Sequence, residues 1–234
     1  MGYLALILTV VAGYILSRFI PVEKKGVMKA LVTFSGAFLF GITLIELLPV
    51  AFSTNAELAS YGILAGFFIQ ILIDFLSEGI EHGHYHHFKK GKAPMMVMIG
   101  LGLHALLEGI PVGFGGGHLD EEVASHLLMA ILAHKLPVAI ILAGLLRGAG
   151  ISNWLQLLLV GAFAFMSPLG MFIGASSFWG SGAAVFLSGL AIGIFLHIST
   201  TILYESSESH SLNYRKLAYV ILGFVLALST HMLH

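Results

Sequence analysis

The sequence predicts an all-α membrane protein, a single domain over residues 1–234 built as a bundle of eight transmembrane helices. Two observations predict this class. Only 10% of the residues are charged and 58% are hydrophobic, whereas a soluble domain carries about 25% charged residues, so most of the surface must face lipid. The few charges also divide the chain into apolar runs close to the ~20 residues that a bilayer-spanning helix needs.

Charged residues and one turn-rich break delimit the spans. No Asp, Glu, Lys or Arg occurs from Gly148 to Tyr204. This stretch is too long for one crossing, and the glycines and serines at 174–182 predict the turn that divides it. The predicted spans lie within residues 1–17, 30–56, 58–80, 93–117, 123–146, the two parts of 148–204, and 217–233.

The basic residues predict the orientation. Ten of the eleven Lys and Arg residues fall at the first, third, fifth and seventh connections between spans, and none at the second, fourth and sixth. Cytoplasmic loops carry the excess of Lys and Arg, so both termini are expected outside and the histidine-rich loop 81–94 inside. The absence of a soluble extension favours a microbial cytoplasmic (inner) membrane. The eleventh cation, Lys135, lies within a predicted span.

The composition also excludes several classes of protein. A net charge of −1 offers no basic surface for a nucleic acid. The chain has no cysteine, which excludes disulfides, thiolate metal ligands and a cysteine nucleophile. The lipid bilayer is therefore the one large partner that the composition predicts.

Three ionisable residues in the fourth and fifth spans are the candidate metal ligands. His104 and Glu108 are four residues apart and share one helix face, and His134 lies in the next span. Pro111 and Pro137 follow them, and we expect these prolines to open the helices and free backbone carbonyls. Ionisable groups at membrane depth are costly and mark sites or pathways. Two imidazoles and a carboxylate suit Zn²⁺ and neighbouring metals; the plain alternative is polar residues that bridge packed helices.

Two further ionisable residues are expected near this site. Lys135 could be a buried cation paired with Glu108 or Glu46, or it could occupy the position of a second metal ion. Glu46 lies just before Pro49. It could line the path of the ion, or it could be a glutamate at a helix end near the outer interface.

Polar groups also gather on both sides of the predicted membrane. The third connection holds four histidines in six positions, a composition typical of metal binding, so we expect either weak capture of metal on the inner side or a solvated loop. An acidic outer segment could attract cations or simply obey the charge asymmetry. The inner group is Glu78, Glu81, His82, His84, His86 and His87, and the outer group is His118, Asp120, Glu121 and Glu122.

Four motifs, in this order, resemble the ZIP (Zrt/Irt-like protein) family of divalent metal transporters. They are Leu47-Leu48-Pro49, His104-x-x-x-Glu108-Gly109, His134-x-x-Pro137 and Ser167-Pro168-Leu169-Gly170. The resemblance covers the whole chain. It implies a ZIP-like bundle with an inverted repeat of spans 1–3 and 6–8 around spans 4–5, metal bound between spans four and five, and an elevator-like movement that carries it inward.

Carried over residue by residue, the resemblance makes His104, Glu108 and His134 the primary ligands. The chain departs from the family at Ala105, Lys135, Val138 and Ser167, where an Asn, an acidic residue, a His or Glu, and a Glu are common. These changes remove most of the second metal position, and an ammonium group beside His134 opposes a second dication. We expect a site for one metal ion, of modest affinity, with Ser167 close to it.

These observations predict a transporter that moves a divalent cation toward the cytoplasm. Zn²⁺ is the first choice, while Fe²⁺, Mn²⁺, Cd²⁺ and Co²⁺ share the ligand chemistry. No enzyme activity and no cofactor are expected. One alternative is a membrane sensor that binds metal without moving it, and a remote one is an intramembrane protease, although His-Glu-x-x-His is absent. A homodimer is left open, because the small-residue faces at Gly36, Gly41, Gly189 and Gly193 permit close packing within or between chains.

Overall fold

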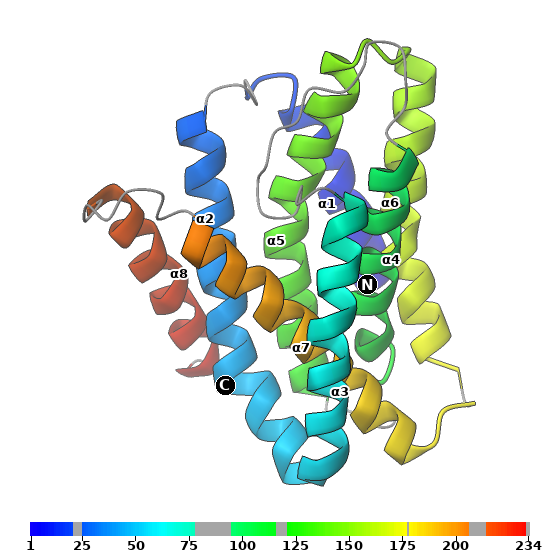
Figure 1. The fold of residues 1–234 in the computed structure, drawn as a ribbon, viewed down its shortest axis with the longest axis vertical. Helices are drawn as coiled ribbons and strands as arrows, with labels where there is room; N and C mark the ends of the chain where they lie inside the picture. Colours follow the sequence, from blue (N-terminus) through cyan, green and yellow to red (C-terminus); the bar gives the residue numbers. More distant parts are fainter. Residues whose placement is uncertain (21–24, 78–94, 116–120, 177, 206–213, 233–234) are drawn as a thin grey trace.

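A computed structural model describes residues 1–20, 25–77, 95–115, 121–176, 178–205 and 214–232, and its regular elements there are all helices. The predicted all-α class is therefore confirmed. The elements, shown in Figure 1, are α1 (Gly2–Leu16), α2 (Lys25–Ile42), the π-helix η1 (Thr43–Leu47), α3 (Leu48–Ser77), α4 (Met95–Val112), α5 (Glu121–Gly148), α6 (Asn153–Gly174), α7 (Ser181–Glu205) and α8 (Tyr214–Met232).

The helix ends follow the apolar runs with small differences. The turn predicted at 174–182 separates α6 from α7. Helix α2 begins at Lys25, before the predicted run. Helix α4 ends at Val112 rather than at residue 117, and a turn at Gly113 and Phe114 follows it.

The second and third predicted spans form one helical path of 52 residues, Gly26–Ser77, with a sharp bend. The bend is at Asn55, whose backbone (φ −161°, ψ 97°) is not helical. Its side-chain oxygen accepts the N–H of Leu58 at 3.0 Å, which caps the helical segment that follows. Figure 1 shows the chain turning back on itself at the foot of α2 and α3.

Two helix pairs cross with their backbones in contact, because glycines line the crossings. A Cβ atom on Gly66 of α3 would lie 1.9 Å from the carbonyl oxygen of Leu190 in α7, and one on Gly174 of α6 would lie 1.9 Å from that of Ile110 in α4. Small residues four apart allow this approach between membrane helices. The glycines are Gly62, Gly66, Gly189 and Gly193 in the first pair, and Gly109, Gly113, Gly170 and Gly174 in the second.

The four glycines that could have formed a contact between two chains instead face helices of the same chain. A Cβ atom on Gly36 would meet Ile202, and one on Gly41 would meet Ala227. Gly189 and Gly193 lie in the α3–α7 crossing already described. These four glycines are therefore used internally and do not favour a homodimer.

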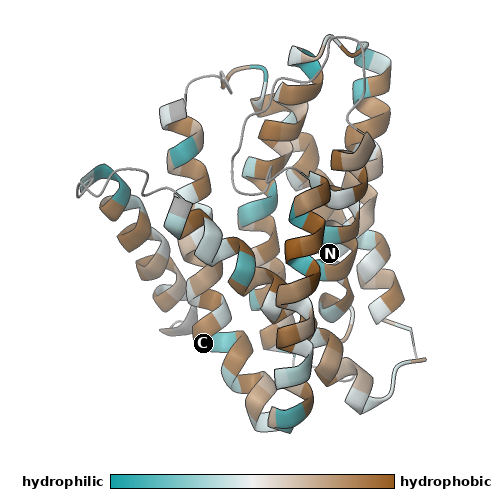
Figure 2. Cartoon of the chain, viewed as in Figure 1, coloured by the Kyte–Doolittle hydropathy of each residue, from teal (hydrophilic) through white to brown (hydrophobic). Residues whose placement is uncertain are grey.

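The outer surface of the bundle is apolar. Leu64, Phe75 and Phe172 are 69%, 88% and 69% exposed, and Figure 2 shows hydrophobic residues along the full length of most helices. Among the described residues, five helical stretches are long and apolar enough to cross a membrane, and α1 is a shorter apolar helix. Within the bundle, α3 packs most extensively on α7, α4 on α6, α2 on α8 and α1 on α5.

Candidate metal centre

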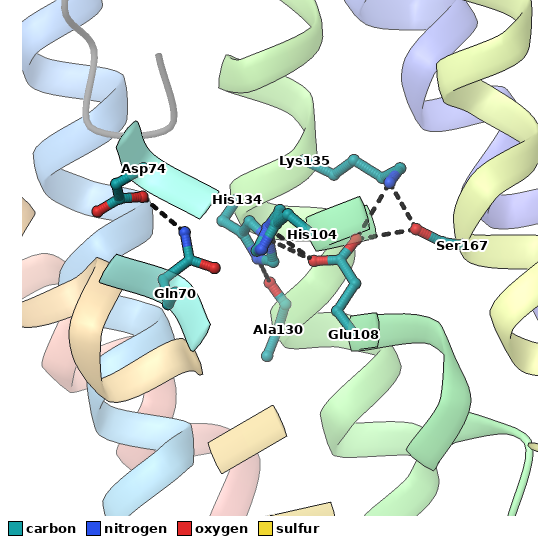
Figure 3. Close-up of polar contacts among 8 residues, drawn as sticks. All are labelled: Gln70, Asp74, His104, Glu108, Ala130, His134, Lys135 and Ser167. Carbon is teal, nitrogen blue, oxygen red and sulfur yellow. Dashed lines mark hydrogen bonds and ion pairs between the residues drawn. The ribbon is translucent and has the colours of Figure 1, made fainter. Parts of the chain in front are cut away.

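An imidazole–carboxylate–imidazole group lies at the centre of the bundle, between α4 and α5 (Figure 3). His104 Nε2 is 3.2 Å and His134 Nε2 is 2.8 Å from the same oxygen, Glu108 Oε2. The three residues are at most 3% exposed, and their ligand atoms lie within 4.8 Å of one another. Two ligands that each lie about 2.0–2.2 Å from a tetrahedral ion are about 3.4 Å apart, so small adjustments would admit one ion.

The helices around this group differ from the expectation for the two prolines. Pro111 lies in the last turn of α4, as the predicted opening requires, but Pro137 lies inside α5, which continues to Gly148. The prediction that Pro137 opens its helix was therefore wrong. Pro137 still cannot donate a hydrogen bond to the carbonyl of Ala133, one turn before it and next to His134.

The ring of His134 has a defined orientation. Its Nδ1 lies 3.0 Å from the carbonyl oxygen of Ala130, and a carbonyl can only accept, so Nδ1 carries a hydrogen. In a neutral ring Nε2 then presents a lone pair to Glu108 Oε2 at 2.8 Å. Two acceptors at this distance need a cation between them, which is either a proton or a metal ion.

Lys135 and Ser167 occupy the other oxygen of the carboxylate. Lys135 Nζ lies 3.1 Å from Glu108 Oε1 and donates to Ser167 Oγ at 2.6 Å, and Ser167 Oγ lies 2.8 Å from the same Oε1. The ammonium group also lies 4.5 Å from the ring centre of Phe163, a cation–π distance. Lys135 is 2% exposed. Of the two partners proposed from the sequence, Glu108 and Glu46, it pairs with Glu108.

Glu46 lies in η1 and contacts His126 rather than Lys135. Its Oε2 is 3.8 Å from His126 Nδ1 of α5, and His126 precedes His134 by eight residues, or about 12 Å of helix. Single π-helical turns often occur at functional sites. The sequence did not single out His126, although a third ionisable residue in an otherwise apolar span could have done so.

A small, partly open pocket with a cavity volume of about 30 Å³ lies between the ends of α3, α4, α5 and α7, near Glu46 and His126 in sequence. Its walls are apolar apart from two hydroxyl groups. The lining residues are Leu47, Val50, Ala51, Thr54, Pro111, Val123, Leu127, Ala184, Val185, Ser188, Ala191 and Ile192.

Most residues of the predicted inner and outer groups lie outside the described part of the chain. This applies to Glu78, Glu81, His82, His84, His86, His87, His118 and Asp120, and to the side chain of Glu122. Glu121 is described: it begins α5 and is exposed.

The fold and this group define a helical membrane protein with a buried set of side chains of the kinds that ligate metal ions. The family model of the ZIP Zinc transporter matches residues 81–230. The chain belongs to this family, as the four motifs predicted, and is an integral membrane protein. Members of the family are transporters and not enzymes, so the protease alternative is excluded.

Individual relatives are similar over parts of the chain. Zinc transporter ZIP1 of Takifugu rubripes is 30% identical over 152 residues, which cover 61% of this chain and 49% of the relative. Zinc transporter ZIP2 of Homo sapiens is 31% identical over 128 residues, 51% of this chain and 40% of the relative. An uncharacterized protein of Methanocaldococcus jannaschii is 24% identical over 199 residues, 82% and 81% of the two chains. The chain thus spans about half the length of the zinc transporters that it matches.

Proposed function

We propose that this chain carries a divalent transition-metal cation across the membrane toward the cytoplasm, with His104, Glu108 and His134 as its ligands. The observation that carries the proposal is the convergence of two imidazole nitrogens on one carboxylate oxygen inside an apolar bundle. Zn²⁺ is the first choice, because imidazole and carboxylate suit it and two relatives are named zinc transporters. Fe²⁺, Mn²⁺, Cd²⁺ and Co²⁺ fit the same donor set.

The two oxygens of the Glu108 carboxylate have different partners, which supports a site for one ion. Oε2 faces the two imidazoles, while Oε1 is held by Lys135 and Ser167. The ammonium group supplies a fixed positive charge where a second dication would otherwise sit, and like charges at this distance repel strongly in a buried site. Lys135 also neutralises Glu108 while no metal is bound, so the empty site does not hold an uncompensated anion.

We infer an elevator-like movement of two groups of helices from the resemblance to the ZIP family. In this proposal α1, α4, α5 and α6 form the first group, in which α4 packs on α6 and α1 on α5, and α2, α3, α7 and α8 form the second, in which α3 packs on α7 and α2 on α8. The two groups meet where α2 packs on α5 and α3 on α4. The proposed ligands, Lys135 and Ser167 all lie in the first group, so that group would carry the ion past the second. In this proposal the chain crosses a cytoplasmic membrane eight times with both termini outside, and spans 1–3 and 6–8 form an inverted repeat.

Flux into proteoliposomes tests the proposal and separates a transporter from a sensor. We expect Zn²⁺ uptake, reported by an internal dye, to fall by at least about 10–100-fold in His104→Ala and Glu108→Ala. Gln156→Ala is the matched control: it removes another buried polar side chain, which bonds to the Ile151 carbonyl in the same helix group. Undiminished uptake in well-folded ligand variants would contradict the site, and zinc binding by the native chain without flux would identify a sensor.

A further inference from the structure

A second polar group lies between α3 and α7, to one side of the central residues (Figure 3). Gln70 donates from Nε2 to Asp74 Oδ1 at 2.7 Å, and His197 Nδ1 is 3.2 Å from Asp74 Oδ2. Phe67 packs against the His197 ring, with 4.9 Å between ring centres. Gln70 is fully buried, and the side chains of Asp74 and His197 are 17% and 13% exposed.

The orientation of the Gln70 amide follows from its partner. A carboxylate only accepts, so Nε2 must face Asp74 and Oε1 must point elsewhere. Oε1 is buried and has no hydrogen-bond partner among the described residues, whereas buried carbonyl oxygens are nearly always paired. In Figure 3 this oxygen points toward the side where His134 and Ala130 lie. A cation that passes there would supply the missing partner.

We propose that Asp74 and His197 form an inner station for the transported divalent cation, and that Gln70 Oε1 guides the ion to it from the central site. The inference rests on the proposed transport function. An imidazole, a carboxylate and an amide oxygen are donors that Zn²⁺, Co²⁺, Fe²⁺ and Mn²⁺ accept. The 3.2 Å between His197 Nδ1 and Asp74 Oδ2 is close to the about 3.4 Å that separates two ligands of one tetrahedral ion.

The station belongs to the other helix group. Asp74 lies on α3 and His197 on α7, which are joined by the glycine crossing, while the central ligands lie on α4 and α5. Asp74 is also three residues from the end of α3 at Ser77, the end that leads into the basic third connection. An ion carried inward by the first group would therefore meet these ligands on the second group, close to the predicted cytoplasmic side.

Cobalt binding to the purified full-length chain in nanodiscs tests the station. In the background variant, Glu108→Gln disables the central site, and asparagines replace the four histidines of the third connection, His82, His84, His86 and His87. We expect this variant to bind about one Co²⁺ per chain in equilibrium dialysis, with the visible absorption of a nitrogen- and oxygen-ligated ion. Adding His197→Phe or the isosteric Asp74→Asn should abolish this binding, while the buried-glutamine control Gln156→Leu should retain it.

Two results would overturn the station: no Co²⁺ bound by the background variant, or an unchanged cobalt count after both His197→Phe and Asp74→Asn. The guiding role of Gln70 has its own readout in the otherwise native chain. Gln70→Leu should lower Zn²⁺ flux about tenfold or more, and unchanged flux would overturn that role. A native chain without flux, but with the expected cobalt counts, would refute the proposed transport and leave the inner site standing.

Discussion

Replacing Glu108 by glutamine should affect stability and metal binding separately. Glu108 is fully buried, and its carboxylate lies within 3.2 Å of His104, His134, Lys135 and Ser167. Glutamine keeps the shape but removes the charge, so the buried ammonium group of Lys135 loses its counter-charge. Removing one partner of a buried ion pair costs about 3–5 kcal/mol. We expect the lower end of this range, because Ser167 still accepts from Lys135 at 2.6 Å.

A second substitution separates the two effects. Lys135→Met removes the uncompensated cation and leaves an apolar side chain against Phe163, so Glu108→Gln with Lys135→Met should recover most of the lost stability. Zn²⁺ binding should not recover, since the Glu108 carboxylate is still missing. We expect affinity to stay at least about 100-fold below that of the native chain, or about 2.7 kcal/mol.

Thermal unfolding in detergent and zinc titration of the same samples measure both quantities. The native chain and the single variant Lys135→Met are measured as well, which completes a double-mutant cycle. If Glu108→Gln unfolds at the same temperature as the native chain, the Lys135–Glu108 ion pair does not stabilise the fold as we describe. If zinc affinity returns together with stability in the double variant, Glu108 acts by holding the fold rather than by binding the metal.

Three further outcomes follow from the structure. Lys135→Glu should restore a second metal position and raise the zinc count in equilibrium dialysis by about one per chain; an unaltered count would contradict the role given to the ammonium group. Zn²⁺ uptake should fall as the outside pH is lowered from about 7.5 to about 5.5, because protons compete for imidazole and carboxylate ligands, and pH-independent uptake would argue against them. Gly66→Ala should prevent stable folding, since its Cβ would lie 1.9 Å from the Leu190 carbonyl, whereas Gly161→Ala has open space and should unfold like the native chain.

The all-helical class could be predicted because the bilayer fixes the length of each apolar run and confines most Lys and Arg residues to the loops on one side. The bend at Asn55 and the π-helical turn before Pro49 could not be predicted from the sequence. Both are local backbone choices inside an apolar context, and a single side-chain cap such as the Asn55–Leu58 contact decides between a loop and a bend.

The candidate site could be predicted in its members but not in its arrangement. The four-residue spacing of His104 and Glu108 places them on one face of any helix. That Lys135 pairs with Glu108 rather than with Glu46 depends on how α4, α5 and α6 pack, which no local pattern specifies. The Asp74–His197 contact was missed for the same reason, because its partners lie on helices far apart in the sequence.

The glycine crossing of α4 and α6 has a consequence for variant screens. Gly109 follows Glu108 directly, and a Cβ atom there would lie 2.2 Å from the carbonyl oxygen of Ser167, the residue whose hydroxyl contacts the carboxylate. Any side chain at Gly109 would push α6 away and pull Ser167 from Glu108. In a saturation screen for zinc uptake, Gly109 should therefore tolerate as few alleles as the ligands do, although it has no functional group of its own.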